Sequence, residues 1–228
     1  MEIQIFRGAL KVLVFDDFFP FAVLQSNLHE AWARKYSGNL KRDLRYSNCF
    51  ESFAFPKFVR GLNTLSLLGE TYHEHRRQLM LKMQLGLTKT YNLFHDPKLS
   101  PETVEKASKQ NTEIAAEAYQ DILRLRELHR QMDEAVLAAY GWHQASEKWG
   151  SAIDLRHDFH EVDYLPENDR IRYTIHPDAR RELLQRLLLL NHERYAEEVK
   201  QGLHDKKGKK KKAVRKRAAT NAAQQSLL

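Results

Sequence analysis

Five side chains in one ten-residue stretch have the chemistry of nucleic-acid contacts. They are three cations and two amides: Asn39, Lys41, Arg42, Arg45 and Asn48. Lysine and arginine bind phosphate oxygens, arginine also pairs with the guanine edge, and asparagine pairs with adenine. The stretch therefore predicts either a loop that faces DNA or a solvated basic loop, and the residue types alone leave both readings open.

The elements on either side of this loop would hold it in place. Apolar residues three or four apart predict one amphipathic helix over 21–36, with Phe21, Leu24, Leu28, Trp32 and Tyr36 on one face. Gly38 offers the left-handed conformation that ends a helix. Residues 46–55 alternate well enough for a strand, which Pro56 closes. We therefore expect Trp32, Tyr36 and this aromatic strand to brace the loop.

The histidines invite other readings. His29 lies on the Leu28 side of its helix, which favours a buried, hydrogen-bonded imidazole. Two sets have the spacing of metal ligands: Glu70, His73 and His75, and His157 and His160 with Asp154, Asp158 and Glu161. Such spacing is common in solvated or hydrogen-bonded surface histidines, so the sequence predicts no metal site.

A nuclease string is also present. Pro177-Asp178 followed by Glu198-Val199-Lys200 matches the order of a metal-dependent nuclease motif. On a single helix, however, about 20 residues would separate the carboxylates by roughly 30 Å. One metal ion does not bridge that distance, so we set the nuclease reading aside.

The net charge of +7 belongs to the C-terminal segment. Residues 205–228 hold nine lysines and arginines and one aspartate, a net +8, which leaves about −1 for the rest of the chain. Such a segment is typical of a disordered tail that binds polyanions without reading sequence. Cys49 is the only cysteine, and no apolar run is long enough to span a membrane, so we expect a cytoplasmic protein.

The order of the elements predicts an α+β fold that is predominantly α-helical. Short strands at 2–6 and 10–15 open the chain, and such an abrupt start favours a piece of a longer protein. Long helices are expected from Leu62 to Gly86, where the glycine would end the first, from Ser100, from Ala115 to Gly141 and from Pro177, with a strand at 170–175 and a polar loop at 143–169. Arg124, Arg126 and Arg130 then fall on a solvated helix face. We expect residues 1–60 and 61–204 to be separate domains and 205–228 to be the tail.

Several motifs, in order, resemble one family. The first stands as Phe21, Val23, Leu24, Ser26, His29, Ala31, Trp32 and Arg34, then Gly38, Leu40, Lys41, Asp43, Arg45, Tyr46 and Ser47. The second is residues 86–97, GLTKTYNLFHDP, and the third runs from Leu125 through His129 and Asp133 to Trp142. A fourth covers Arg181 to Tyr195. Together they resemble the region behind the catalytic domain in MmeI-like adenine-N6 DNA methyltransferases of restriction-modification and phage-defence systems.

The resemblance implies a role in DNA recognition. Residues 1–60 would be the end of the target-recognition region, 61–204 the helical C-terminal domain, and duplex DNA the ligand of Asn39, Lys41, Arg42, Arg45 and Asn48. An adenine methyltransferase also needs a glycine-rich cofactor turn and an Asn/Asp-Pro-Pro-aromatic loop, and the sequence has neither a Pro-Pro pair nor clustered glycines. We therefore expect no catalytic or cofactor-binding residue in this chain.

Three hypotheses follow. The chain is the specificity portion of a site-specific methyltransferase, and S-adenosylmethionine binds a catalytic domain or subunit elsewhere. In the second, the activity belongs to a parent polypeptide of which this is one part. In the third, the chain is an inactive truncated fragment or a helical scaffold without DNA affinity.

Overall fold

The computed structural model describes residues 13–40, 43–57 and 63–204, without the side chains of 38–40, 43–48, Asn63 and Asn168. The chain divides into two compact units, residues 1–186 and 187–228. The helices and strands are α1 (Phe19–Gln25), α2 (Asn27–Tyr36), β1 (Gly38–Leu40), β2 (Asp43–Arg45), α3 (Tyr46–Ser52), α4 (Asn63–Met83), α5 (Leu87–Phe94), α6 (Pro101–Ser108), α7 (Thr112–Ala139), β3 (Asp158–Glu161), the 3-10 turn η1 (Glu167–Asp169), β4 (Ile171–Thr174) and α8 (Pro177–Lys200).

The fold is α+β and mostly helical, as the sequence predicts. Its described strands form two small antiparallel sheets. The predicted strands at 2–6 and 10–12 and the tail 205–228 lie outside the described residues, and residues 13–15 form no strand. No described helix is long and apolar enough to cross a membrane. The domain boundary at residue 60 stays a prediction.

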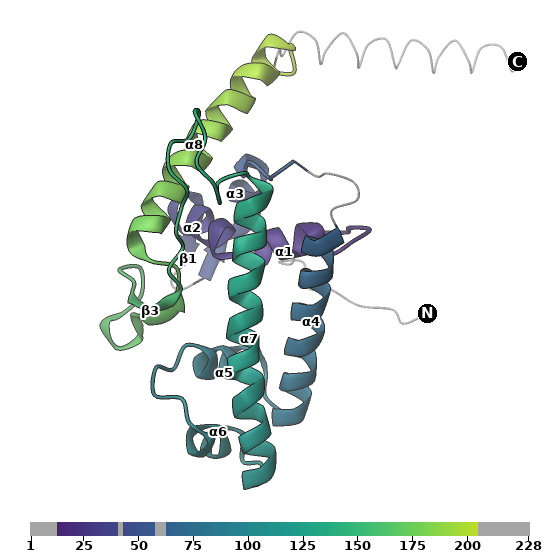
Figure 1. The fold of residues 1–228 in the computed structure, drawn as a ribbon, viewed down its shortest axis with the longest axis vertical. Helices are drawn as coiled ribbons and strands as arrows, with labels where there is room; N and C mark the ends of the chain where they lie inside the picture. The colour runs from purple at the N-terminus through teal and green to yellow at the C-terminus, as the bar shows by residue number, and fades with distance from the viewer. Residues whose placement is uncertain (1–12, 41–42, 58–62, 205–228) are drawn as a thin grey trace, which may run out of the picture. The chain divides into compact units, whose positions relative to one another are not determined.

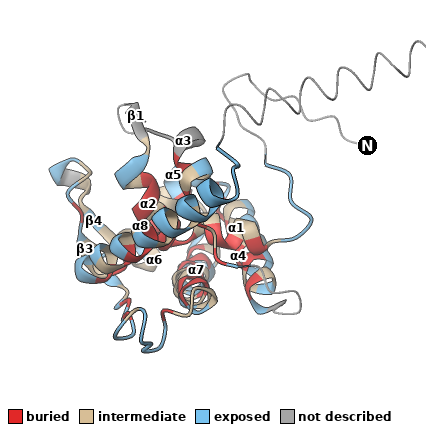
Figure 2. Cartoon of the chain, turned by 90° about the horizontal axis from the view of Figure 1, so that it is seen from above, coloured by how far each residue is buried: buried red, intermediate tan, exposed pale blue. Residues whose placement is uncertain are grey.

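Two long helices form the frame of the first unit. α4 and α7 pack against each other and run in opposite directions, and the short α5 and α6 lie between them along the chain (Figure 1). The apolar positions that predict α7 are buried: Ala115, Ala118, Ile122, Leu125, Met132 and Val136. Figure 2 shows this buried side of α7 together with those of α1 and α2.

Local signals account for several helix ends. Ser100 and Thr103 form the capping box that begins α6, and the Asn111 side chain accepts from the Ile114 N–H at 2.9 Å to begin α7. Gly141, with φ of 74°, follows the end of α7 as predicted. The predicted stop of α4 at Gly86 is wrong, because the helix ends at Met83 and Gln84 takes the left-handed conformation with φ of 53°.

The predicted single helix over 21–36 is two helices. Ser26 is extended, and its hydroxyl accepts from the His29 N–H at 3.3 Å, so it caps a new helix, α2. The chain therefore turns between α1 and α2. α1 lies close to α4, because a Cβ at Gly69 would be 2.8 Å from the Phe18 carbonyl oxygen and 3.1 Å from the Ala22 Cβ.

Two strand predictions differ in outcome. Residues 171–174 form β4, which pairs with β3 from Asp158↔Thr174 to Glu161↔Ile171 inside the region predicted as a loop. The strand predicted at 46–55 is wrong, because residues 46–52 form α3. Cys49 and Phe53 are both buried and lie four residues apart, which is the spacing of a helix. The same residues also fit a weak alternating pattern, which is why the sequence predicts a strand.

Candidate nucleic-acid interface

The predicted recognition loop is a hairpin followed by a helix. β1 and β2 pair in the register Gly38↔Arg45, Asn39↔Leu44 and Leu40↔Asp43, and α3 begins at Tyr46. The structure places the backbone of Asn39, Arg45 and Asn48 on β1, β2 and α3, respectively. Lys41 and Arg42 lie outside the described residues, as do all five predicted side chains.

Aromatic residues connect the helices on either side of the hairpin. Trp32 on α2 is 2% exposed and donates its Nε1–H to the Cys49 carbonyl of α3 at 3.2 Å. Phe53 lies against the His29 ring at 4.9 Å and the Trp32 ring at 6.3 Å between centroids. The centroid of the Tyr36 ring, at the end of α2, lies 4.2 Å from that of the Trp32 ring. The helices that precede and follow the hairpin are thus joined beneath it.

His29 has the structural role that its position predicts. It is buried, and its Nδ1 lies 3.1 Å from the Leu24 carbonyl oxygen. Burial lowers its pKa from 6.5 to about 4, although the Leu24 carbonyl and Glu30 act in the opposite direction. The imidazole is therefore neutral at pH 7 and part of the core.

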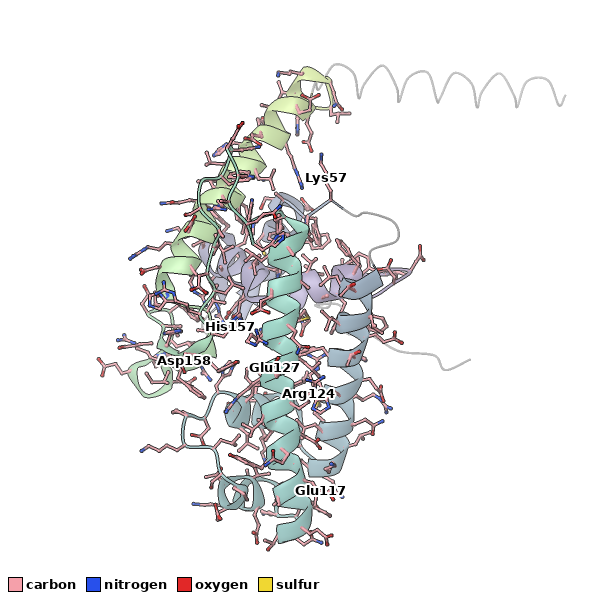
Figure 3. The ribbon with its side chains drawn as sticks, viewed as in Figure 1. Lys57, Glu117, Arg124, Glu127, His157 and Asp158 are labelled. Carbon is pink, nitrogen blue, oxygen red and sulfur yellow. The ribbon has the colours of Figure 1, made fainter. Side chains whose placement is uncertain are left out.

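A buried carboxylate joins this region to the helical frame. Asp133 on α7 is fully buried and accepts from the Asn27 N–H at 2.8 Å, the Asn27 Nδ2 at 2.7 Å and the His157 Nε2 at 2.7 Å. His157 comes from the segment that leads into β3 and lies beside α7 (Figure 3). Burial alone would raise the pKa of Asp133, but the hydrogen bonds from His157 and Asn27 hold it below its usual value.

Thr174 and His129 extend this cluster. The Thr174 hydroxyl donates to Asn27 Oδ1 at 2.8 Å and accepts from Arg180 Nη2 at 2.9 Å. Asn27 Nδ2 also lies 3.0 Å from His129 Nε2, which must accept because the amide nitrogen only donates. We call Asn27, His129, Asp133, His157 and Thr174 the buried polar centre.

The accepting Nε2 fixes the protonation of His129. Its remaining proton is then on Nδ1, which donates to the Tyr72 hydroxyl at 3.2 Å. Tyr72 in turn donates to the Tyr91 hydroxyl at 2.6 Å, which also accepts from Arg76 at 3.2 Å. Burial lowers the pKa of His129, consistent with a neutral ring. The centre thus holds one ionised carboxylate and continues into a hydroxyl chain toward α4 and α5.

A pocket of about 420 Å³ lies beside the buried polar centre. Its lining combines amides, aromatic rings and arginines from α1, α2, α5, α7 and β4: among them are Gln25, Asn27, Arg34, Tyr91, Tyr164 and Arg172. Arg34 lies over the Tyr164 ring at 4.5 Å and pairs with Glu30 at 3.3 Å. The charged groups that line this pocket are thus largely paired with one another.

Arg126 corrects the prediction of a solvated arginine face. Its guanidinium donates to the carbonyls of Phe94 at 2.9 Å and Asp96 at 3.0 Å, and lies 4.9 Å from the Phe159 ring. Burial lowers its pKa from the usual value. Arg126 of α7 therefore contacts both the end of α5 and β3. Arg124 on the same helix is exposed, as predicted (Figure 3).

The histidine sets show no metal-ligand geometry. Within the described residues, no three His, Cys, Asp or Glu side chains converge on a point that could hold a metal ion. His75 lies 2.7 Å from the Asp121 carbonyl oxygen and His160 lies 3.0 Å from the Arg156 carbonyl oxygen. The prediction that His157 is a surface histidine is wrong, because its side chain is 2% exposed and bound to Asp133.

Sequence reasoning missed the buried polar centre. Its members lie far apart, since Asn27 and Asp133 are separated by 106 positions and Asn27 and Thr174 by 147. One local signal was available, because Asp133 lies next to Met132 and four residues after His129 on the apolar side of α7. A carboxylate on such a face needs buried donors.

Comparison with known proteins gives one match, to the N-terminal part of the chain. Residues 2–57 match the family model described as "MmeI, target recognition domain". Neither the curated proteins nor the solved structures give a match to the chain. The matched segment covers α1, α2, the β1–β2 hairpin and α3, the elements that Trp32 and Phe53 hold together. Residues 2–57 are therefore similar to MmeI-type target recognition domains, which supports a role for this region in DNA recognition.

Proposed function

We propose that this chain is the DNA-binding and specificity portion of an adenine-N6 DNA methyltransferase in a restriction-modification or phage-defence system. The observation that carries the proposal is the match of residues 2–57 to a target recognition domain, which contains the whole β1–β2 hairpin. The downstream motifs at 86–97 and 125–142, which resemble the same enzymes, support it.

The hairpin and the start of α3 form the reading surface in this proposal. Lys41, Arg42 and Arg45 contact phosphate oxygens or guanine edges, and Asn39 and Asn48 contact adenine edges or phosphates. Two features support these roles: the residue types, and a hairpin whose flanking helices are joined by Trp32 and Cys49 at 3.2 Å. A rigid base lets a short hairpin present side chains in a fixed register.

The helical part carries the reading surface and does no chemistry. Asn27 in the matched region is bound by Asp133 in α7 at 2.8 Å and 2.7 Å, so the two proposed domains, 1–60 and 61–204, share a buried connection. Methyl transfer from S-adenosylmethionine belongs to a catalytic domain or subunit outside this chain. The tail at 205–228, with a net +8, adds affinity for DNA without sequence preference.

Selection from a randomised duplex library tests the proposal. The full chain, alone and with the catalytic partner, is expected to enrich one short motif, and a chain that ends at Leu203 should enrich the same motif with a weaker salt dependence. Binding without enrichment in either protein would mean that the chain supplies only charge. No binding at all would favour a helical scaffold without DNA affinity.

A pair of arginine variants then locates the reading surface. Arg45→Ala should weaken binding to the selected motif by roughly 1–3 kcal/mol and relax preference at one base pair, if the contact is to a base. Arg130→Ala is the matched control, because Arg130 lies on α7 and pairs with Glu127 at 2.6 Å. If only Arg130→Ala alters motif preference, the reading surface lies on α7 instead.

A further inference from the structure

A second polar surface lies away from the hairpin, in a groove of about 930 Å³ that α5, α6 and the segment before β4 form. Its cations come from three separate parts of the chain: Lys89, Lys106, Lys109, Arg170 and Arg172. Three carboxylates, Asp96, Glu167 and Asp169, also line it, so the five cations leave a net +2. Outside the tail the chain as a whole has a net charge of about −1, which makes this groove a local exception.

The three lysines of the groove have no ion-pair partner among the described residues. Lys89, Lys106 and Lys109 are exposed and take part in none of the ion pairs formed among the described residues. Lys82 is the contrast, because it pairs with Asp121 at 2.6 Å and Glu117 at 3.1 Å. We call the surface around these three residues the lysine groove.

The carboxylates of the groove are fewer than its cations. Asp169 pairs with Arg172, whereas Asp96 accepts from the neutral Lys98 N–H at 2.8 Å and keeps its charge. Glu167 is exposed. The three free lysine ammonium groups outnumber these two carboxylates, so the potential inside the groove is positive.

The inner wall reinforces that sign. His95 lines both the groove and the 420 Å³ pocket, and burial, followed by the charges of Arg172 and Arg126, lowers its pKa to about 3. The neighbouring guanidinium groups thus oppose a further positive charge at this point. The first turn of α5, which includes Thr88 and Lys89, begins at Gly86 without a side-chain cap, and its free N–H groups add positive partial charge.

We propose that the lysine groove holds the phosphodiester backbone of duplex DNA. Lysine ammonium groups on flexible stems suit phosphates as point charges, whereas base reading favours the planar donors of arginine and asparagine. The groove therefore positions the duplex, and the hairpin reads it. This inference rests on the proposed function, because it takes DNA as the ligand.

The test measures the salt dependence of duplex binding by the full chain and single-lysine variants. Lys89→Gln, Lys106→Gln and Lys109→Asn each remove one ammonium group, and asparagine suits position 109 because Lys109 has φ of 59°. Each should reduce the slope of log K against log salt by about 0.9, and the triple variant by nearly 3. Lys148→Gln is the control, since Lys148 is also exposed but lies over the Trp149 ring at 4.6 Å, outside the groove.

The selected motif supplies a second readout. Weaker binding with the same motif preference in the triple variant supports a positioning role. Unchanged slopes in all three variants overturn the inference, and leave the proposed function intact if the wild-type chain still enriches a motif. A change equal to that of Lys148→Gln also overturns it, because any lost charge would then suffice. If the wild-type chain binds no DNA, both proposals fail.

Discussion

The buried polar centre and the lysine groove are both built from charged and polar side chains of the first unit, but they satisfy those groups differently. Asp133 accepts three hydrogen bonds from protein donors and is fully buried. Lys89, Lys106 and Lys109 are exposed and have no ion-pair partner among the described residues. A buried polar group whose bonds are complete stabilises the fold, whereas an exposed set of like charges is available to a ligand.

The largest expected effect comes from removing the acceptor of the buried polar centre. Asp133→Ala leaves the Asn27 amide groups and the His157 Nε2–H buried without their partner, so we expect unfolding free energy to fall by about 3–5 kcal/mol in urea titrations. Glu134→Ala, the neighbouring exposed residue, should change it by less than about 1 kcal/mol. Equal stability of the two variants would mean that the centre is no more structural than the surface.

The second largest effect should come from low pH, which lowers the unfolding free energy through the buried histidines. The pKa of His29 is about 4 in the folded chain against 6.5 ordinarily, so between these pH values the unfolded chain binds a proton that the folded chain does not. Unfolding free energy should therefore fall as pH drops from 6.5 to 4, by about 3 kcal/mol for this group. His95 and His129, whose pKa values are also lowered, act in the same direction.

His29→Gln separates this contribution from the others. The variant should show a shallower fall of unfolding free energy between pH 6.5 and 4, measured by urea titration at each pH. A slope that matches the wild-type chain would show that His29 protonates equally in both states.

A smaller difference is expected between two arginines of α7. Arg126→Gln removes donors to the carbonyls of Phe94 and Asp96 and should cost about 2 kcal/mol of unfolding free energy. Arg130→Gln removes only pairs with Glu127 and Glu134 at the surface and should cost less than about 1 kcal/mol. Thermal unfolding of both variants checks the order, and a reversed order would contradict our assignment of Arg126.

The smallest effect should belong to the lysine groove. Lys106→Gln should change unfolding free energy by no more than about 0.5 kcal/mol, because the side chain is exposed and has no ion pair in the described part of the chain. The same urea titrations measure it. A loss comparable to that of Arg126→Gln would make Lys106 a structural residue and remove the contrast between the two regions.

Periodicity and local capping predicted much of the helical frame. The buried face of α7 and the start of α6 at Ser100 follow from patterns within a few residues. The break at Ser26 and the helix at 46–52 did not follow, because a serine fits a helix or a cap and a short apolar run fits a helix or a strand.

The sites also differ in whether the sequence alone could predict them. The hairpin residues stood out because five of them fall within ten positions. The buried polar centre and the lysine groove did not, since their members come together only through packing: Lys89 and Lys106 lie on different helices, and Asn27 meets Asp133 across 106 positions. No local sequence pattern indicates which of these distant residues will lie next to each other in the fold.

The bond from Thr174 to Asn27 has a consequence for biosynthesis. The asparagine amide cannot complete its bonds until a residue 147 positions later has been made. At about 5–20 residues per second, translation of that interval takes roughly 7–30 s. During this time the Asn27 side chain lacks one of its final hydrogen-bond partners. The buried polar centre is thus complete only after the segment that contains Thr174 has been translated.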